Sequence, residues 1–417
     1  MTPVFEEYIK FLKDNNVNLN IESGYYWIDR QIIRGFDKNG ESHKVARILI
    51  DDNLNVSCKK YDTNNVEFIS WKELVELKKD EILMKENESI NLIKKSISKY
   101  NEYEPICLTS GGKDSSVTMY LLRQVVPNSK GIFNNTSLDC ADTYLHIKDL
   151  KNIDTISPEE GFYQWRERNN FIPTRFARAC CSIFKENALL EKYDNSKKSL
   201  FFMGMRNSES ANRSEYGDEW SNDIWGDNWK GILPIRKWTD LDVWLYILMK
   251  DIPINKKYKK GYARVGCAVA CPFYSKSTWA LDKYWYEYLY ERWQEILQDD
   301  FIENNKWIVM NCTLKEYKTC WNGGVFREEP TEDVINEFAE YNKLNYDVAK
   351  NYFNHTCTKC KKAKKIKDKE VLAMNMKLLG RTSKKMCKKH LKEFLSMSED
   401  EWKEQVESFK ASGCSLF

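Results

Sequence analysis

The sequence predicts an α/β protein whose central domain is built on a parallel sheet. Short apolar runs at 106–109, 130–134 and 200–205 alternate with helical patterns at 115–125, 141–150 and 186–193. Such an alternation is typical of a parallel sheet with crossover helices. A glycine pair follows the first apolar run. Ligands of open parallel sheets bind beyond the carboxyl ends of the strands, which is where this pair is expected to lie.

Residues 1–100 are expected to form a small β unit and a linking helix. Strand composition occurs at 25–29, 45–50 and 55–61, between turn-rich stretches at 35–42 and 51–53. From Trp71 to Tyr100, leucine and isoleucine recur at near-helical intervals among lysine and glutamate. This segment leads into the central domain, which we expect over residues 101–300.

Residues 301–417 are expected to form a helical region with a cysteine-containing module and a short amphipathic tail. Lysine, asparagine and glutamate dominate its first part, and helical patterns occupy 331–343 and 347–353. A chain of 417 residues is long enough for two or three domains.

The composition limits which partners and which cellular location are expected for the protein. Lysine and arginine number 65 against 62 acidic residues, for a net charge of +3, so any nucleic-acid surface must be local. The sequence has no apolar stretch of about 18 residues, and its first residues include acids where a signal peptide is basic and apolar. We therefore expect a soluble, cytoplasmic protein that does not insert into a membrane.

The segment Ser110-Gly-Gly-Lys-Asp-Ser-Ser116 is the most informative about chemistry, because it predicts a phosphate site. Gly111 and Gly112 allow a tight turn that brings backbone N–H groups toward an anion, and the following helix start adds partial positive charge. Lys113 adds a cation, and hydroxyl donors are present at Ser110, Ser115 and Ser116. The spacing differs from that of a Walker A loop. The alternative is a glycine turn before an ordinary helix.

A second anion site is predicted where the run at 200–205 ends. Gly204 is followed by a loop that presents Arg206, Ser208, Ser210 and Arg213. A guanidinium offers paired donors to a phosphate or sulfate, and Glu209 can hold one guanidinium in place. Two such loops suit a nucleotide with two anionic ends. The alternative is a surface loop with ordinary ion pairs.

These segments resemble one known family. The first loop is similar to the SGGxDS loop of the PP-loop ATP pyrophosphatases and the phosphoadenylyl-sulfate (PAPS) reductase relatives. Those relatives have a G-x-R-x-x-[EQ]-S-x-x-R segment like that at Gly204, and later a P-[ILV]-x-x-W-x-x-x-D-V-W segment, matched here by Pro234 to Trp244. The matches occur in the family's order over roughly residues 104–275.

The resemblance implies a fold of the adenine-nucleotide α-hydrolase type and an enzyme. The loop from Ser110 to Ser116 would hold the phosphates of ATP or PAPS, with Lys113 and Asp114 orienting them or a bound Mg²⁺. Gly204 would lie at the second anion site, where Arg206 and Arg213 would bind the far anion.

Most of the thirteen cysteines occur in groups, which in a reducing compartment favours metals, clusters or chemistry over disulfides. In the sulfonucleotide reductases that carry a [4Fe–4S] cluster, an adjacent cysteine pair and a later Cys-x-x-Cys are the ligands. That pattern maps onto Cys180, Cys181, Cys267 and Cys271, although three residues separate the last two here instead of two. Zinc bound by the same thiols and four buried thiols without a metal are the alternatives.

A structural zinc site is predicted near the C-terminus. Cys357-Thr-Lys-Cys360 is followed by Cys387-Lys-Lys-His390, and two such pairs complete a tetrahedral site. The residues that could replace one ligand are His355, Cys312 and Cys320. Lysines concentrated around these pairs would attract a nucleic-acid backbone, or alternatively keep a solvated zinc module soluble.

The tail contains one cysteine, Cys414, within Ser-Gly-Cys-Ser-Leu-Phe417. Reductases of the family carry a nucleophilic cysteine on a C-terminal Glu-Cys-Gly-Leu-His segment, so Cys414 is the candidate nucleophile even though the flanking Glu and His are absent. Leu416 and Phe417 docking on a partner, or an unstructured end, are the alternatives.

Three functions follow from these patterns. The first is a PAPS-reductase-like oxidoreductase that takes electrons from a thioredoxin-like or other donor. The second is an ATP pyrophosphatase that adenylates a nucleic acid for thiolation of tRNA or phosphorothioation of DNA. The third is a nucleotide-responsive nucleic-acid-binding protein without turnover.

Overall fold

The chain was analysed as a computed structural model, which describes residues 1–194, 196–209, 213, 215–221, 225–323, 327, 329–353, 359–360, 366, 368–379 and 385–411. It divides into two compact units, each described by itself. Unit 1 contains Met1–Gly161, Ile183–Val269 and Tyr274–Glu287. Unit 2 contains Phe162–Ser182, Ala270–Phe273 and Tyr288–Phe417. The three-part division expected from the sequence stays a prediction.

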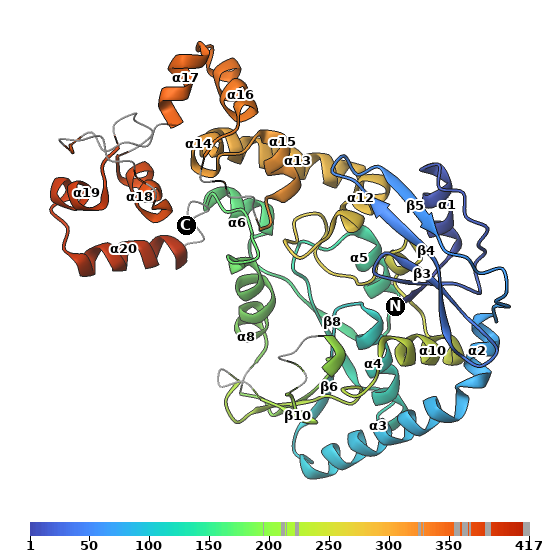
Figure 1. Ribbon diagram of the computed structural model, residues 1–417. Coiled ribbons are helices and arrows are strands. Elements are labelled where there is room, and N and C mark those ends of the chain that lie inside the picture. Colours follow the sequence, from blue (N-terminus) through green and yellow to red (C-terminus); the bar gives the residue numbers. More distant parts are fainter. Residues whose placement is uncertain are drawn as a thin grey trace. The chain divides into compact units, whose positions relative to one another are not determined.

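Unit 1 begins with an antiparallel sheet in the order β1-β2-β3-β4-β5 (Figure 1). The strands are β1 (Thr2–Pro3), β2 (Trp27–Asp29), β3 (Ile32–Phe36), β4 (Ser42–Ile50) and β5 (Val56–Lys60). Ala46 and Ile48 of β4 share a core with α1 (Glu6–Asp14). The predicted β unit is confirmed, but β3 and α1 were not predicted. Gly35, expected in a turn, lies in β3, where a Cβ would fall 2.3 Å from the Phe68 ring.

The linking segment predicted as one helix is two helices, α2 (Trp71–Leu77) and α3 (Lys79–Lys99), which are separated at Lys78. The Ser70 hydroxyl accepts a hydrogen bond from the Glu73 backbone N–H (3.2 Å), and the Glu73 carboxylate accepts one from the Ser70 N–H (2.7 Å). This capping box fixes the start of α2.

The central sheet of unit 1 has the order β10-β11-β9-β6-β7-β8. Its strands are β6 (Glu104–Thr109), β7 (Lys130–Asn134), β8 (Ile153–Ile156), β9 (Ser199–Met203), β10 (Glu219–Trp220) and β11 (Trp229–Ile232). All neighbouring strands are parallel except β10 and β11. The predicted parallel sheet is therefore confirmed, with one antiparallel strand at its edge.

Helices lie between these strands in the chain or follow the last of them. They are α4 (Lys113–Val125), α5 (Ala141–Asp149), α8 (Ala188–Lys192), α10 (Asp240–Lys250), α11 (Lys256–Lys259) and α12 (Lys276–Trp285). The helix expected at 186–193 begins as a π-helix over Ser182–Asn187 and continues as α8.

The strand order reverses beside β6. On one side β6 pairs with β7, which leads to β8, and on the other side it pairs with β9. In open α/β sheets, ligands bind at such a reversal, beyond the carboxyl ends of the two strands. The loop that starts α4 and the loop after Met203 both begin at this place.

Unit 2 is helical. Its helices are α6 (Phe162–Arg168), α7 (Ala179–Cys181), α13 (Glu287–Glu303), α14 (Lys306–Met310), α15 (Leu314–Cys320), α16 (Glu332–Asn342), α17 (Tyr346–Phe353), α18 (Lys369–Leu379), α19 (Lys388–Leu395) and α20 (Glu399–Ala411). The helical patterns at 331–343 and 347–353 are confirmed as α16 and α17. A small core that includes Met374, Leu391 and Trp402 joins α18, α19 and α20. Within the described ranges, no helix combines the length and hydrophobicity that a membrane span requires.

Candidate functional site

The loop after β6 is held in shape by its own hydroxyl groups. Gly111 has a φ of +68°, a left-handed conformation that glycine adopts at little cost. The Gly111 N–H donates to the Thr109 hydroxyl (3.1 Å), and the Ser110 N–H donates to the Ser115 hydroxyl (3.3 Å). The Ser115 hydroxyl donates in turn to the Gly112 carbonyl (2.9 Å). Ser115, expected to bind phosphate, is therefore engaged in bracing the loop.

The first turn of α4 is suited to receive an anion. Gly112 is its N-cap, and no side chain caps the turn. A helix start of this kind presents backbone N–H groups and partial positive charge. The Lys113 N–H already donates to the Tyr258 hydroxyl (2.9 Å), so Tyr258 fixes one edge of the turn. Ser116 is buried at 5% exposure, and its hydroxyl has no hydrogen-bond partner among the described residues.

Gly204 brings the end of β9 against this turn. A Cβ at this position would lie 2.6 Å from the carbonyl carbon of Asp114 and 2.7 Å from the Ser115 nitrogen. Because both neighbours are backbone atoms, no side-chain movement would make room. Gly204 therefore allows the two loops to approach each other, and its role at the second anion site stays a prediction.

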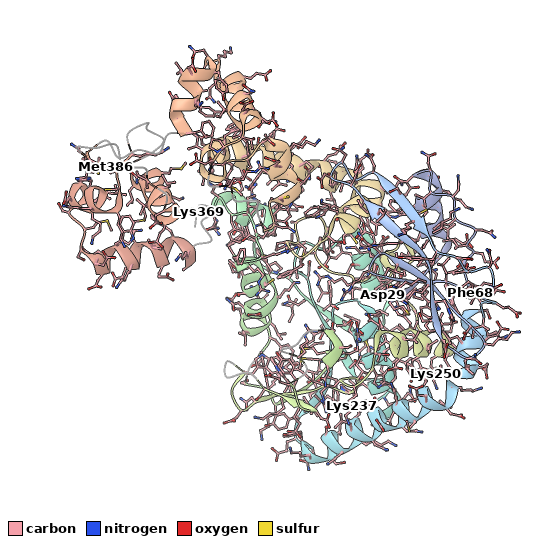
Figure 2. All side chains as sticks on the ribbon, in the orientation of Figure 1. Asp29, Phe68, Lys237, Lys250, Lys369 and Met386 are labelled. Atoms are coloured by element: carbon pink, nitrogen blue, oxygen red, sulfur yellow. The ribbon has the colours of Figure 1, made fainter. Side chains whose placement is uncertain are left out.

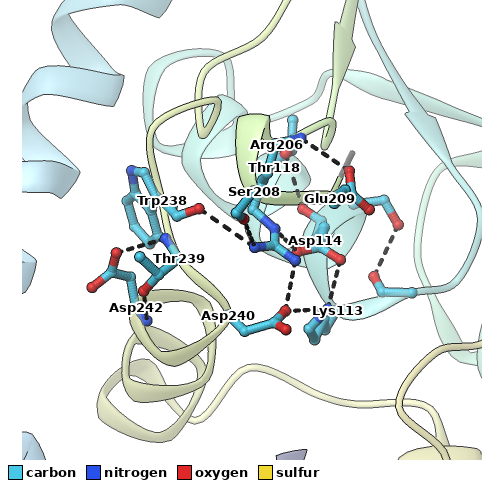
Figure 3. A network of polar contacts seen from close by, with 12 residues as sticks. Lys113, Asp114, Thr118, Arg206, Ser208, Glu209, Trp238, Thr239, Asp240 and Asp242 are labelled. Carbon is cyan, nitrogen blue, oxygen red and sulfur yellow. Dashed lines mark hydrogen bonds and ion pairs between the residues drawn. The ribbon is translucent and has the colours of Figure 1, made fainter. Parts of the chain in front are cut away.

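Four charged side chains form a compact network at this approach (Figure 3). The Lys113 ammonium lies 2.9 Å from the Asp114 carboxylate and 3.1 Å from that of Asp240. The Arg206 guanidinium lies 2.6 Å from each of the same two carboxylates. The two cations are 5% and 3% exposed, whereas Asp114 is 18% and Asp240 40% exposed, so the cations are buried beneath carboxylates that face the solvent. Each cation thus contacts both anions.

Burial and charge act in opposite directions on the pKa values of this network. Burial favours neutral Lys113, but the Tyr258 hydroxyl, Asp114 and Asp240 outweigh it, and the pKa of Lys113 rises above its usual range. Burial likewise favours neutral Asp240, but Lys113, the Met1 amino group and Arg206 hold its pKa well below the usual range. Lys113 and Asp240 are therefore charged near neutral pH.

Further contacts orient Arg206 and Arg213. The Arg206 guanidinium donates to the Ser208 hydroxyl (2.9 Å) and to the Trp238 carbonyl (3.4 Å). The Glu209 carboxylate accepts a hydrogen bond from the Arg206 backbone N–H (3.0 Å) and pairs with Arg213. The prediction that Glu209 holds a guanidinium agrees with this arrangement, and that guanidinium is Arg213.

An open pocket of about 560 Å³ lies over the network. Its charged side chains are Asp29, Lys113, Asp114, Arg206, Glu209, Asp240 and Arg264. The sequence analysis missed Asp240, Asp29, Arg264 and Tyr258. Asp240 could have been found, because Thr239 and Asp242 form a capping box that places Asp240 at the first position of α10. Tyr258 and Arg264 carry no local signal, since only the tertiary fold brings them to the site.

The cysteines predicted to bind a cluster are distributed over both units. Cys180, Cys181 and Cys271 belong to unit 2, and Cys267 belongs to unit 1. Cys180 and Cys267 are buried at 7% and 8% exposure, whereas Cys181 and Cys271 are half-buried. A common site for the four thiols stays a prediction.

Three of the predicted zinc ligands come together in unit 2. The Sγ atoms of Cys360 and Cys387 are 3.9 Å apart, and the Nδ1 atom of His390 lies 3.5 Å from the first and 3.3 Å from the second. Cys387 directly follows Met386, which is labelled in Figure 2. Zinc bonds of about 2.0–2.3 Å in a tetrahedron place ligand atoms roughly 3.3–3.8 Å apart. The three atoms therefore fit zinc. Among the described residues, this group includes neither Cys312 nor Cys320.

Several predicted residues lie outside the described ranges. They are Ser210, His355, Cys357 and Cys414. The fourth zinc ligand and the nucleophile of the tail thus stay predictions.

Comparison with known proteins finds a family match over the middle of the chain. The model of the phosphoadenosine phosphosulfate reductase domain family matches residues 104–272. An uncharacterised protein of Methanocaldococcus jannaschii is 29% identical over 276 residues, which cover 63% of this chain and 66% of the relative. A second uncharacterised protein of that organism is 30% identical, and the match covers 55% of its length. The chain thus spans two thirds or less of these relatives.

Two characterised proteins are also similar. Adenosine 5'-phosphosulfate reductase of Bacillus mycoides is 28% identical over 185 residues, or 40% of this chain and 74% of the reductase. The solved phosphoadenylyl-sulfate reductase of Candida auris has a TM-score of 0.35 at 14% identity, covering 43% of this chain and 88% of that one. The family match covers the strands of the parallel sheet and the loop that starts α4, so residues 104–272 are similar to the phosphoadenosine phosphosulfate reductase domain family.

Proposed function

We propose that this protein is an enzyme that binds an adenine nucleotide at the start of α4 and uses it for sulfur-related chemistry. One observation carries the proposal. The uncapped first turn of α4 lies at the reversal of strand order, with the Lys113 and Arg206 cations beside it. Backbone N–H groups and paired cations in this arrangement suit the phosphates of a nucleotide. Catalysis would depend mainly on positioning and charge neutralisation.

The charge of the pocket favours ATP that arrives with Mg²⁺. Lys113, Arg206 and Arg264 face four carboxylates, those of Asp29, Asp114, Glu209 and Asp240. A bare triphosphate would be repelled by these acids, whereas Mg²⁺ takes carboxylate and phosphate oxygens together. We infer that Asp114 and Asp240 turn toward the metal, which leaves Lys113 and Arg206 to contact phosphate oxygens.

In the reaction we favour, an acceptor oxygen attacks the α phosphorus of ATP. The bond between the α phosphorus and the bridging oxygen breaks, and pyrophosphate leaves with the bonding electrons. A sulfur nucleophile then displaces AMP from the adenylated acceptor. Lys113 and Arg206 would neutralise the charge that develops on the departing pyrophosphate. The proposed acceptor is a nucleic acid.

Reduction of a sulfonucleotide is the second candidate, and the family match favours it. A thiolate would attack the sulfur of PAPS or adenylyl sulfate, and the nucleotide would leave. An electron donor such as a thioredoxin-like protein would then release sulfite from the resulting enzyme thiosulfonate. Cys414 is the proposed nucleophile.

We propose two metal sites. The cysteine pattern of the family supports a [4Fe–4S] cluster on Cys180, Cys181, Cys267 and Cys271, with zinc on the same thiols as the alternative. The distances among Cys360, Cys387 and His390 support a structural zinc, which Cys357 would complete. Iron, sulfide and zinc measured per chain in anaerobically purified protein separate these assignments. We expect four irons and one zinc, and Cys387→Ser should lose the zinc alone.

One anaerobic assay tests the reaction. The protein is incubated with Mg²⁺ and either ATP or PAPS, and the products are identified. AMP and pyrophosphate from ATP support adenylation, whereas sulfite and adenosine bisphosphate from PAPS support reduction. Binding of ATP without any turnover, in the presence of nucleic acid and a sulfur donor, would instead support the non-catalytic function. No binding of either nucleotide would contradict all three.

A further inference from the structure

Unit 2 contains a second pocket, of about 450 Å³, that the nucleotide site does not use. Its walls come from α14, α16, α17 and α18 and the residues next to them. This volume lies within the range of about 300–1,000 Å³ that is usual for small-molecule sites. The residues that matter here are Asn305, Trp307, Phe338, Tyr341, Tyr352 and Lys385.

The walls of this pocket are aromatic and incompletely covered. Trp307 is buried at 3% exposure and Phe338 at 3%, whereas Tyr341 is 53% exposed and Tyr352 is 36% exposed. The ring centroids of Trp307 and Tyr341 are 4.9 Å apart, and those of Phe338 and Tyr352 are 5.4 Å apart. Each buried ring therefore supports an exposed tyrosine. Planar ligands stack on such tyrosines, because stacking covers the apolar ring face that water now contacts.

The polar groups of the pocket narrow the class of ligand. The side-chain oxygen of Asn305 is buried and has no hydrogen-bond partner among the described residues. Asn305 is the residue before α14 and has a φ of 47°, a left-handed backbone conformation. Lys385, which is 8% exposed, supplies a cation, and no carboxylate lines the pocket. A cationic ligand is therefore disfavoured, and a planar group with both a hydrogen-bond donor and an acceptor fits.

The chain that follows Lys385 is rich in lysine. Lys388, Lys389 and Lys392 line an open hollow at the start of α19. Lys388 and Lys392 are paired with Glu399. Lys389 is 77% exposed, and its ion pair with Glu393 is long, at 3.9 Å. Exposed lysines and aromatic rings together are the combination that binds single-stranded nucleic acids, in which the lysines contact phosphates and the rings stack on bases.

We propose that this pocket receives one unpaired nucleobase of a nucleic-acid strand. The base stacks on Tyr341 or Tyr352, its carbonyl or ring nitrogen accepts from Lys385, and its amino or imino group donates to Asn305 once that side chain turns its oxygen into the pocket. Lys389 contacts the adjacent backbone. The inference rests on the proposed function, because it gives the nucleic-acid acceptor of the proposed adenylation a binding site. It is tested without ATP, so that the base-binding pocket and the adenylation reaction can fail independently.

Fluorescence anisotropy of the full-length protein with a labelled 12-nucleotide strand tests this proposal. DNA and RNA of the same sequence, single-stranded and duplex, are compared. We expect the single strand to bind more tightly than the duplex. Tyr341→Ala should weaken its binding about 5- to 100-fold, the effect of losing one stacked base. Tyr341→Phe should stay close to the wild type, because the ring is kept.

Tyr288→Ala is the matched control, since Tyr288 is also exposed (72%) and lies on α13 away from the pocket lining. Circular dichroism checks that each variant is folded. Unchanged binding by both Tyr341→Ala and Tyr352→Ala would overturn the proposal, as would equal affinity for duplex and single strand. If Tyr341→Ala is unfolded, Lys385→Gln provides the test, and wild-type affinity in that folded variant would count against the pocket.

Discussion

Lys113 and Arg206 reach phosphate only if their present partners give way. Each cation contacts both Asp114 and Asp240, so a ligand must either replace these carboxylates or bring a metal that binds them. We therefore expect nucleotide binding to depend on Mg²⁺. The carboxylates of Asp114 and Asp240 also stabilise the two buried cations when no ligand is bound, because an unpaired buried charge costs several kcal/mol.

Lys113→Met should weaken binding of Mg²⁺-ATP about 10- to 100-fold, which corresponds to losing a hydrogen bond to a charged group. Isothermal titration calorimetry measures the affinity. Lys130→Met is the control, because Lys130 is 52% exposed and its ion pair with Glu104 is 3.8 Å long. Equal affinities for Mg²⁺-ATP in the two variants would show that Lys113 does not contact the bound nucleotide.

Because Asp282 is buried, we expect the free energy of unfolding of unit 1 to depend on pH. Burial raises its pKa from 3.8 to about 6, against the opposing effects of Lys257 and Tyr262. The folded state thus keeps a proton that the unfolded state releases, so this contribution to stability is lost as pH rises from about 4 to about 6. The loss should reach roughly 3 kcal/mol.

Urea unfolding at a series of pH values checks this slope. Asp282→Asn should flatten it between pH 4 and 6, whereas Asp251→Asn, a change at an exposed position, should leave it unchanged. Parallel curves for wild type and Asp282→Asn would show that another group titrates in this range.

The contact between β9 and α4 is the most important contact between elements for the proposed function, because it brings together the two loops that are proposed to bind anions. It depends on the absence of a side chain at Gly204. Gly204→Ala should destabilise the protein by roughly 1–3 kcal/mol through overpacking, and should also weaken nucleotide binding by shifting the start of α4. Thermal unfolding and ATP titration measure the two effects.

Gly217→Ala is the matched control, since its nearest neighbour would be 3.5 Å from the new Cβ, an ordinary contact. Its melting temperature should stay near that of the wild type. A Gly204→Ala protein that melts at the same temperature as the wild type would show that β9 and α4 can move apart without loss of stability.

Elements with strong local patterns could be predicted, and those defined by tertiary contacts could not. The apolar run of β7 and the periodic residues of α16 and α17 were correct within one or two residues. β8 and β11 were missed because Ile153–Ile156 and Trp229–Ile232 are short and mix polar with apolar residues. β3 was hidden by Gly35, whose role is to admit the Phe68 ring.

The same distinction applies to the site. Ser110 to Ser116 form one continuous motif, so the sequence could place the phosphate loop at a strand end. It could not show that Arg206 would share its carboxylate partners with Lys113, because Asp240 comes from α10. It also could not separate Ser115, which braces the loop, from hydroxyls that would face a ligand.

At the scale of the whole molecule, the two units are expected to respond to different ligands. Calorimetry should resolve two unfolding transitions. Mg²⁺-ATP at one hundred times its dissociation constant should stabilise unit 1 by about 2.7 kcal/mol and leave unit 2 unchanged. Removal of zinc by a chelator should lower only the transition of unit 2, where Cys360, Cys387 and His390 lie. A single transition that responds to both treatments would show that the units unfold together.

The reversal of strand order beside β6 has a consequence for how this chain can diversify. Ladder hydrogen bonds hold β6 and β9 in register, and the residues that directly leave their carboxyl ends are held by the approach of Gly204 to α4 and by the ion pairs of Lys113 and Arg206. Insertions or exchanges farther along the segment after β9 would therefore reshape the mouth of the cleft without disturbing the frame. If the proposed function holds, such changes would alter which acceptor the enzyme uses and would leave its nucleotide site intact.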